Sequence, residues 1–416
     1  MGLPLPARAP GPAPRVRPAP AAGAGPLPGR AVRRLAVLGG EPAFPDGLPF
    51  VRPSPPPLAR VAARLASSYH LGVLTNGPLV REFEEATAER LGVAHVVATS
   101  SCTTGLMLAV QAVAERGKTV LMPSFTFSAT AHAATWAGGV PAFADCDPDT
   151  FLLDADVDLD GAGAVMATHT FGAPCHPSTL DRRARDAGVP LVFDAAHAFG
   201  SSHRGRPVGG FGTAEVFSLT PTKPLVAGEG GLVATGDAAL AETLRHGRDY
   251  GNPGDYDTRF AGLNGRMSEL HAAVGLEALA GFDEHLARRR GLAERYRAGL
   301  AGVPGVRLQQ VDEADRSTWK DLTVAVEPEA FGATRDDLVA ALRAEGVDTR
   351  CYFSPPVHRQ TSYRGVGTPP GGLPRTDRLA AEVVSLPIWP DLTDSEVDRV
   401  AAIVAEVHTR AGELVG

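Results

Sequence analysis

The chain of 416 residues is longer than a single small core requires, which predicts one large domain and a smaller one. Its apolar content of 44% and charged content of 21% are typical of a globular protein and exclude a fibrous or wholly disordered chain. The net charge of −7 argues against nonspecific nucleic-acid binding, and no apolar run approaches the roughly 20 residues of a membrane helix.

The four cysteines are widely scattered and form no CxxC pair; they are Cys102, Cys146, Cys175 and Cys351. Such spacing favours neither a zinc site nor a disulfide framework. We therefore expect a cytoplasmic protein with no bound metal, no membrane association and no nucleic-acid partner.

Residues 1–34 are mostly Pro, Ala, Gly and Arg and show no hydrophobic periodicity. Residues 1–40 contain six arginines and no acidic residue, so the rest of the chain is more acidic than the net charge suggests. This composition predicts a disordered tail. A start codon placed too far upstream gives the same composition, and the sequence leaves both explanations open.

Helices and short apolar strands alternate in the next part of the chain. Apolar residues at helical spacing predict helices over 79–92 and 102–116. Short β-rich runs predict strands over 94–100, 119–124, 140–145, 164–169, 190–194, 214–219 and 231–235. This alternation indicates a mostly parallel sheet with helices on both faces.

The pattern changes after about residue 240. A long helical stretch near 265–300 is followed by a strand over 321–328 and helices over 335–346 and 395–410. We therefore predict an α/β fold with a large domain of residues 35–290 and a small C-terminal α+β domain of residues 291–416.

Candidate functional residues fall at the carboxyl ends of the predicted strands, where open parallel sheets bind ligands. The SSCTT turn at 100–104 offers amides and hydroxyls to a phosphate, although an ordinary helix cap explains it too. Asp194 ends an apolar strand, where a carboxylate needs a cation such as a pyridinium nitrogen or caps a following helix. His197 alone is more typical of a core histidine.

Lys223 follows Ser218 by five residues and precedes the glycines of GEGG. An amine that attacks a carbonyl must be neutral part of the time, which a desolvated site with a neighbouring cation arranges. A solvated surface lysine is the other interpretation. A phosphate cradle, an acid at one strand end, and Ser and Lys at another are together the set that pyridoxal phosphate requires.

Six motifs occur in order over about residues 36–410: SSCTTG, PSFTFSATAHA, HTFG, FDAAHAFGS, FSLTPTK…GEGG and GLNGRMSELHAAVGL. With them the chain resembles the DegT/DnrJ/StrS family of pyridoxal-phosphate-dependent sugar aminotransferases. The resemblance implies the aspartate-aminotransferase-like fold, fold type I. It also implies an amino donor, Glu or Gln, and a nucleotide-linked keto-sugar or keto-cyclitol acceptor in cell-surface polysaccharide or secondary-metabolite biosynthesis.

The resemblance further implies roles for single residues. Lys223 matches the lysine that binds the cofactor's aldehyde and then moves a proton, and Asp194 matches the aspartate that pairs with the pyridine nitrogen. His197 stands near the ring hydroxyl. Phe127 matches an aromatic residue that stacks on the cofactor, although a core position explains it equally well. The family's phosphate-binding positions fall on Cys102, Thr103 and Ser218.

Three further residues concern the partner subunit and the acceptor. Asn264 matches an asparagine that reaches the phosphate of the neighbouring subunit, so the resemblance implies a homodimer with shared active sites. Arg266 and His358 are the candidates for binding the acceptor, as is Arg359, and for the last two a solvated loop explains the sequence equally well.

The chain departs from the family pattern at three positions, none of which removes a reacting group. Cys102 replaces a glycine, Gly265 replaces an aromatic residue, and Pro224 directly follows Lys223. One branch of the family carries histidine in place of the lysine and dehydrates keto-sugars, and Lys223 argues against that branch. A pyridoxal-phosphate-dependent sugar dehydratase and a non-catalytic cofactor-binding regulator are the alternatives to an aminotransferase.

Overall fold

The computed structural model describes residues 34–414, so the predicted tail lies outside the described residues except for Arg34. The chain from Leu35 onward forms one compact unit. None of the helices in this described part has the length and apolar character of a membrane span.

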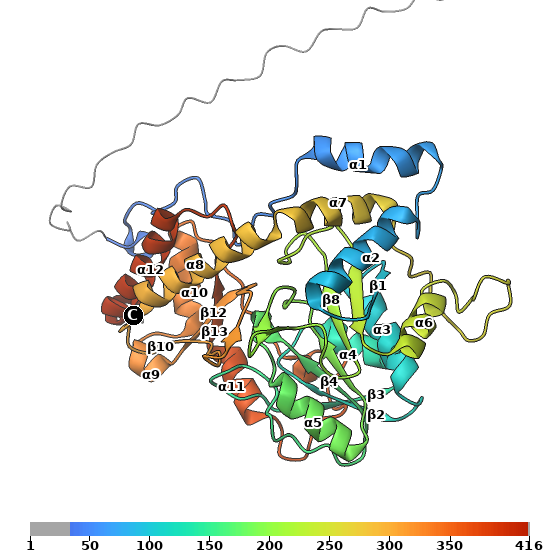
Figure 1. Ribbon diagram of the computed structural model, residues 1–416. Coiled ribbons are helices and arrows are strands. Elements are labelled where there is room, and N and C mark those ends of the chain that lie inside the picture. The colour runs from blue at the N-terminus through green and yellow to red at the C-terminus, as the bar shows by residue number, and fades with distance from the viewer. Residues whose placement is uncertain (1–33, 415–416) are drawn as a thin grey trace, which may run out of the picture. The chain divides into compact units, whose positions relative to one another are not determined.

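A seven-stranded sheet in the order β1-β9-β8-β5-β4-β2-β3 forms the centre of the fold (Figure 1). Its strands are β1 (His95–Thr99), β2 (Thr119–Pro123), β3 (Val140–Ala144), β4 (Ala162–Thr168), β5 (Leu191–Asp194), β8 (Ala214–Ser218) and β9 (Gly231–Thr235). Only β9 runs antiparallel to its neighbours, β1 and β8. The prediction of a mostly parallel sheet is confirmed, and six strands end at the same edge.

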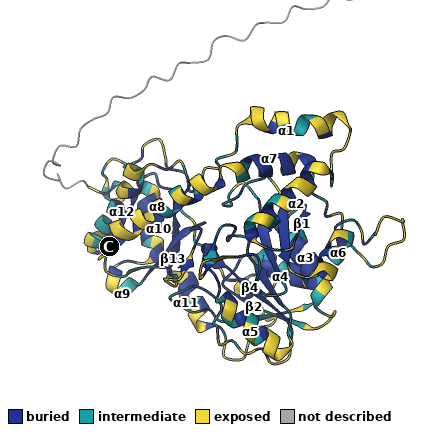
Figure 2. Ribbon diagram, in the orientation of Figure 1, coloured by how far each residue is buried: buried dark blue, intermediate teal, exposed yellow. Residues whose placement is uncertain are grey.

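Helices cover both faces of this sheet, because alternate strand residues point to opposite sides. Helices α3 (Cys102–Val113), α4 (Ser128–Trp136) and α6 (Ala238–Gly247) pack on one face. Helices α1 (Leu58–His70), α2 (Pro78–Leu91), α5 (Pro177–Ala187) and α7 (Glu269–Ala280) supply the cores on the other face. Figure 2 shows the central strands buried and the outer helix faces exposed.

The predicted helical stretch near 265–300 is two helices, α7 and α8 (Phe282–Leu300), which meet at Gly281. The sequence prediction was too long at its start, because residues 265–268 precede the helix and Ser268 caps it. Figure 1 shows the two helices in succession between the large sheet and the C-terminal helices.

A second sheet has three antiparallel strands in the order β10-β12-β13, and α8, α10 (Arg335–Ala344) and α12 (Asp394–Thr409) share a core with it. The strands are β10 (Val306–Leu308), β12 (Leu322–Val326) and β13 (Val383–Leu386). Leu35, Phe44 and Leu48 also belong to this core. The boundary at 290/291 falls inside α8, and the division into two domains stays a prediction.

The remaining elements are short. A third sheet of three strands joins β6 (Ser202–His203) to β7 (Arg206–Pro207) and to β11 (Asp315–Arg316). The other helices are α9 (Pro328–Phe331), α11 (Pro374–Glu382), α13 (Ala411–Leu414) and the 3₁₀ turns η1 (Ala36–Leu38), η2 (Thr170–Gly172) and η3 (Val357–Arg359).

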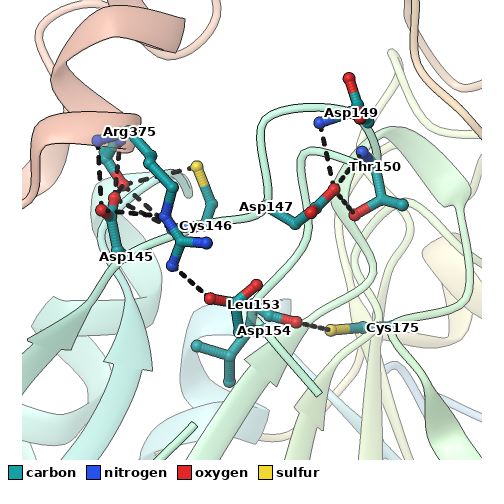
Figure 3. Close-up of polar contacts among 10 residues, drawn as sticks. Asp145, Cys146, Asp147, Asp149, Thr150, Leu153, Asp154, Cys175 and Arg375 are labelled. Carbon is teal, nitrogen blue, oxygen red and sulfur yellow. Dashed lines mark hydrogen bonds and ion pairs between the residues drawn. The ribbon is translucent and has the colours of Figure 1, made fainter. Parts of the chain in front are cut away.

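Helix α11 is tied to the loop that follows β3. Arg375 pairs with Asp145 at 3.3 Å and with Asp154 (Figure 3). The Thr376 hydroxyl donates to Asp145 at 2.6 Å. Because Asp145 receives the hydrogen bonds of two α11 residues, this loop and the C-terminal part of the chain hold each other in place.

A buried carboxylate, Glu269, holds the entry of α2. Its side chain is fully buried and accepts hydrogen bonds from the amides of Gly77, Leu79 and Val80 at 2.9–3.0 Å. The Ser68 hydroxyl donates to it at 2.8 Å. We expect Glu269→Ala to lower the free energy of unfolding by about 3 kcal/mol, because buried donors lose their acceptor.

Urea denaturation followed by circular dichroism measures this loss. Glu85→Ala is the matched control on the exposed face of α2 and is expected to change the free energy by less than about 0.5 kcal/mol. Equal stability of the two variants would contradict the role given to Glu269.

Candidate active site

A cavity of about 360 Å³ lies at the edge of the large sheet where the parallel strands end. Its walls include residues at or just after the ends of β1, β4, β5 and β8. The sequence-predicted residues that the structure brings to this cavity are Cys102, Thr103, Phe127, Asp194, His197, Ser218 and Lys223.

The first turn of α3 supplies free backbone donors to the cavity. The Ser101 side chain caps the helix by accepting from the Thr104 amide at 3.1 Å. The amides of Cys102 and Thr103 donate to no described residue, so they are available to an anion at the helix N-terminus. The hydroxyl of Ser218, at the end of β8, is a further free donor beside them.

Gly231 allows this turn to lie against the sheet. A Cβ at Gly231 would lie 2.6 Å from the backbone nitrogen of Cys102, a distance at which the backbone would have to shift. The Cys102 thiol donates to the Val216 carbonyl at 3.7 Å, and burial raises its pKa well above the ordinary range. The thiol therefore packs on the sheet as a neutral group, and Cys102 offers its amide to a ligand.

Asp194 is a buried carboxylate without an ion-pair partner among the described residues. It accepts hydrogen bonds from the Thr130 hydroxyl at 2.6 Å and from the Ala196 amide at 3.1 Å. Burial outweighs these bonds and raises the pKa of its carboxyl. Turns, not a helix, follow Asp194, so the helix-capping alternative does not apply. A cationic ligand group beside this carboxylate would stabilise its charged form.

His197 is held as a neutral donor. Its Nδ1 accepts from the Phe171 amide at 3.1 Å, which leaves the proton on Nε2. Burial is the main cause that lowers its pKa well below the ordinary value, and the charges of Lys223 and Lys320 add to it. The imidazole lies parallel to the Phe171 ring, with centroids 6.2 Å apart.

The amine of Lys223 lies in the cavity and forms no hydrogen bond or ion pair with a described residue. Burial, and next the charge of Lys320, lower its pKa from 10.5 to about 8. Near neutral pH this amine is therefore uncharged far more often than that of a solvated lysine, and the interpretation as a surface lysine does not apply.

Phe127 is at the cavity and is 59% exposed, so it is not the core residue that the sequence equally allowed. Four predicted residues do not line the cavity, and one of them, Arg359, is an exposed side chain that pairs with Asp377 at 3.0 Å. Asn264 accepts from Arg266 at 3.1 Å, and Arg266 pairs with Asp249 at 2.6 Å. His358 is buried and bonded to Ser124 at 2.6 Å, so its predicted substrate contact has no support from this geometry.

The cavity residues that the sequence interpretation did not single out include Lys320, Asp321, Tyr352 and Phe353, which come from the C-terminal part of the chain. Lys320 and Asp321 directly precede β12, and their ammonium and carboxylate lie 2.7 Å apart. A charged Lys-Asp pair directly before an apolar strand was a signal in the sequence. Whether this pair belongs to the site depends on β12 lying next to the edge of the large sheet, and spacing along the chain does not show that.

These residues fit pyridoxal phosphate. Free amides and hydroxyls are present for a phosphate, and a buried carboxylate lacks a cation that a pyridinium nitrogen provides. A neutral imidazole N–H is available to a ring oxygen, and an amine with a lowered pKa is available to an aldehyde.

Comparisons with known proteins agree with this geometry. The DegT/DnrJ/EryC1/StrS aminotransferase family matches residues 59–405. The dTDP-3-amino-3,4,6-trideoxy-alpha-D-glucose transaminase of Streptomyces venezuelae is 35% identical and aligns over 85% of this chain and 94% of its own. The spore coat polysaccharide biosynthesis protein SpsC of Bacillus subtilis is 32% identical over 81% of this chain and 91% of its own.

A solved structure gives the same result for the fold. The crystal structure of DesI in the presence of its TDP-sugar product has a TM-score of 0.85 and 42% sequence identity to this chain. The match covers 92% of this chain and 98% of the other. The expected fold, that of type I pyridoxal-phosphate enzymes, is thereby confirmed.

The lowered pKa of Lys223 predicts how cofactor binding depends on pH. The neutral amine is the reacting form, so the rate of covalent attachment of pyridoxal phosphate to the apoprotein should rise about tenfold per pH unit below pH 8. Above that pH the rate should level off. Stopped-flow absorbance measures the rate, and an inflection near 10.5 would contradict the desolvated amine.

Proposed function

Because the chain belongs to the DegT/DnrJ/EryC1/StrS aminotransferase family, we propose that it transfers an amino group from an amino acid, Glu or Gln, to a nucleotide-linked keto-sugar or keto-cyclitol. The enzyme is a pyridoxal-phosphate-dependent transferase. The amine of Lys223, buried in the cavity with a pKa of about 8, is the observation that carries the proposal.

Pyridoxal phosphate, when bound, would supply an aldehyde carbon that takes up the amino group from the donor and a ring that withdraws electrons from the carbon losing its proton. The amides of Cys102 and Thr103 and the Ser218 hydroxyl would hold its phosphate. Asp194 would pair with the ring nitrogen and keep it protonated, and the Nε2–H of His197 would donate to the ring hydroxyl.

The chain's own reacting group is the Lys223 amine. It would bind the aldehyde in the resting enzyme and, once released by the incoming amino acid, act as the base that moves a proton between substrate and cofactor carbons. Its pKa of about 8 suits both tasks near neutral pH, where a general base works best when its pKa is close to the ambient pH. Phe127, at the cavity, would stack on the ring.

The relatives support a thymidine-diphosphate sugar as the acceptor. The Streptomyces relative is named as a transaminase for a dTDP-linked aminosugar, and DesI was crystallised with a TDP-sugar product. The similarity to SpsC supports cell-surface polysaccharide synthesis as the alternative setting. The free state of all four cysteines, which are found in the described residues, supports a reducing cytoplasm.

We further propose a homodimer in which each subunit completes the other's site. Asn264 is exposed and lies outside its own cavity, where a family asparagine reaches the neighbouring subunit's phosphate. Large apolar side chains near it in sequence, Tyr250, Tyr256 and Leu270, are 49%, 94% and 50% exposed. Exposed aromatic and apolar residues of this kind are typical of subunit interfaces.

Replacing the reacting lysine tests the proposed reaction. Lys223→Ala should remove the absorbance of the covalently bound cofactor and lower amino transfer from glutamate by about a thousandfold or more, because the base is lost. Spectrophotometry and product analysis on a panel of dTDP-linked keto-sugars measure both. Lys118→Ala, at an exposed lysine, is the matched control and should keep both properties. An unchanged spectrum in Lys223→Ala would exclude Lys223 as the cofactor lysine.

Hybrid dimers test the shared site. Lys223→Ala and Asn264→Ala chains, each impaired alone, are co-expressed with different tags. If sites are shared, each hybrid dimer has one intact site and one with both defects. Random pairing at equal amounts then gives about a quarter of the wild-type activity. Hybrids purified with both tags that show no recovered activity would contradict a role for Asn264 in the partner's site.

A further inference from the structure

The chain contains only three lysines, Lys118, Lys223 and Lys320, and the other 37 of its 40 basic residues are arginines. Lys118 is exposed and lies near Glu115. The other two lysines both line the active-site cavity. Arginine supplies most of the positive charge in this chain, so a second lysine at the cavity indicates a need for the compact amino group that an arginine lacks.

The backbone at Lys320 is fixed to the loops that carry the cofactor site. The Lys320 amide donates to the Phe171 carbonyl at 3.0 Å, and the Thr318 hydroxyl donates to the His197 carbonyl at 2.6 Å. Trp319 between them has a φ of 50°, in the left-handed region that most side chains avoid. A bulky residue held in this conformation and bonded on both sides indicates that the position of Lys320 is strongly constrained.

The ammonium of Lys320 is oriented by its neighbour. Its Nζ lies 2.7 Å from Asp321 Oδ1, and the two residues are only 6% and 2% exposed. A buried ammonium without such a partner would lose its charge. Lys320 has three N–H donors, and no described residue other than Asp321 accepts from them. The structure therefore leaves donors of Lys320 available on the cavity wall.

Aromatic residues flank this pair. Tyr352 and Phe353 line the same wall, and the Lys320 ammonium lies 5.8 Å from the centroid of the Tyr352 ring. The Phe353 ring packs on the rings of Phe125 and Phe171, with centroid distances of 5.5 and 5.6 Å, and these contacts fix its position. An apolar ring face beside an oriented charged donor suits a sugar, which presents C–H faces and hydroxyl groups.

We propose that Lys320, oriented by Asp321, is the specificity-determining residue of the acceptor subsite and donates a hydrogen bond to a hydroxyl oxygen of the keto-sugar. This inference rests on the proposed aminotransferase function and names the residue that would read the sugar. The carboxylate of the amino donor is a poorer ligand, because Asp321 already neutralises the ammonium at 2.7 Å and would repel a second carboxylate.

Substrate binding to the pyridoxal-phosphate holoenzyme tests the proposal without turnover, since a keto-sugar is not aminated by this form. Isothermal titration calorimetry compares dTDP, dTDP-linked keto-6-deoxyhexoses, and analogues that each lack one hydroxyl. The unmodified enzyme should bind one hydroxyl-deleted analogue about 10- to 100-fold more weakly than its parent. Equal binding of every analogue would overturn the proposal.

Two variants locate that discrimination on Lys320. Lys320→Met removes the donor, and the double variant Lys320→Met with Asp321→Asn also removes the carboxylate that would be left unpaired. Each folded variant should bind the parent sugar about 10- to 100-fold more weakly and no longer distinguish the hydroxyl-deleted analogue. The Kd for dTDP and the KM for L-glutamate should stay within about threefold of the wild type. Lys118→Met is the matched control.

Discrimination that survives in both variants, or a KM for glutamate that rises as much as the Kd of the sugar, would overturn the assignment. These outcomes differ from failure of the proposed function. In that case the unmodified enzyme, converted to its pyridoxamine form with glutamate, would aminate none of the keto-sugars.

Discussion

In the proposed function Lys223 acts as a nucleophile and a base at neutral pH, and a lysine with this role must be buried away from water. The fold provides this burial. Strands that run in one direction end at one edge of the large sheet, and their ends bring Asp194, Ser218 and Lys223 to one cavity. Burial lowers the pKa of the Lys223 amine and raises that of the Asp194 carboxyl, so the charged form of each group is less stable here than in water.

The two polar regions of the cavity wall differ in how they carry charge. At the α3 end, free amides and a hydroxyl offer a site for an anion without a fixed positive charge. The Lys320–Asp321 pair, which comes from a later part of the chain, brings to the cavity a cation with its own counterion. The charge of Lys320 adds to the lowering of the Lys223 pKa. The chain thus places a positive charge close enough to affect the reacting amine without leaving that charge unpaired.

Much of the fold and part of the site follow from sequence pattern. Apolar runs separated by helical segments gave all seven strands of the large sheet, because buried parallel strands have a strong signal. The antiparallel direction of β9 was not predictable from the sequence. It results from a connection of about a dozen residues after β8 that returns the chain at the same edge of the sheet without a crossover helix. Strand β10 was missed because it is only three residues long, and β13 was missed because it directly follows α11 with no turn residue between them.

The site residues that could be predicted are those on the strand ends and turns of the large sheet. Lys320 and Tyr352 reach the cavity from parts of the chain about 100 residues or more beyond Lys223, and local spacing does not show such contacts. His358 lies in a segment that the sequence equally allowed to be a solvated loop, yet it is buried and bonded to Ser124, and its contact with a substrate stays a prediction.

Transfer of a labelled nitrogen tests the central claim most directly. Purified enzyme is loaded with pyridoxal phosphate and supplied with ¹⁵N-labelled L-glutamate and the keto-sugar that it binds best. Mass spectrometry then follows the sugar and the 2-oxoglutarate. The account predicts one ¹⁵N atom in the sugar for each 2-oxoglutarate formed. A sugar that loses water without gaining nitrogen, with no 2-oxoglutarate, would contradict it.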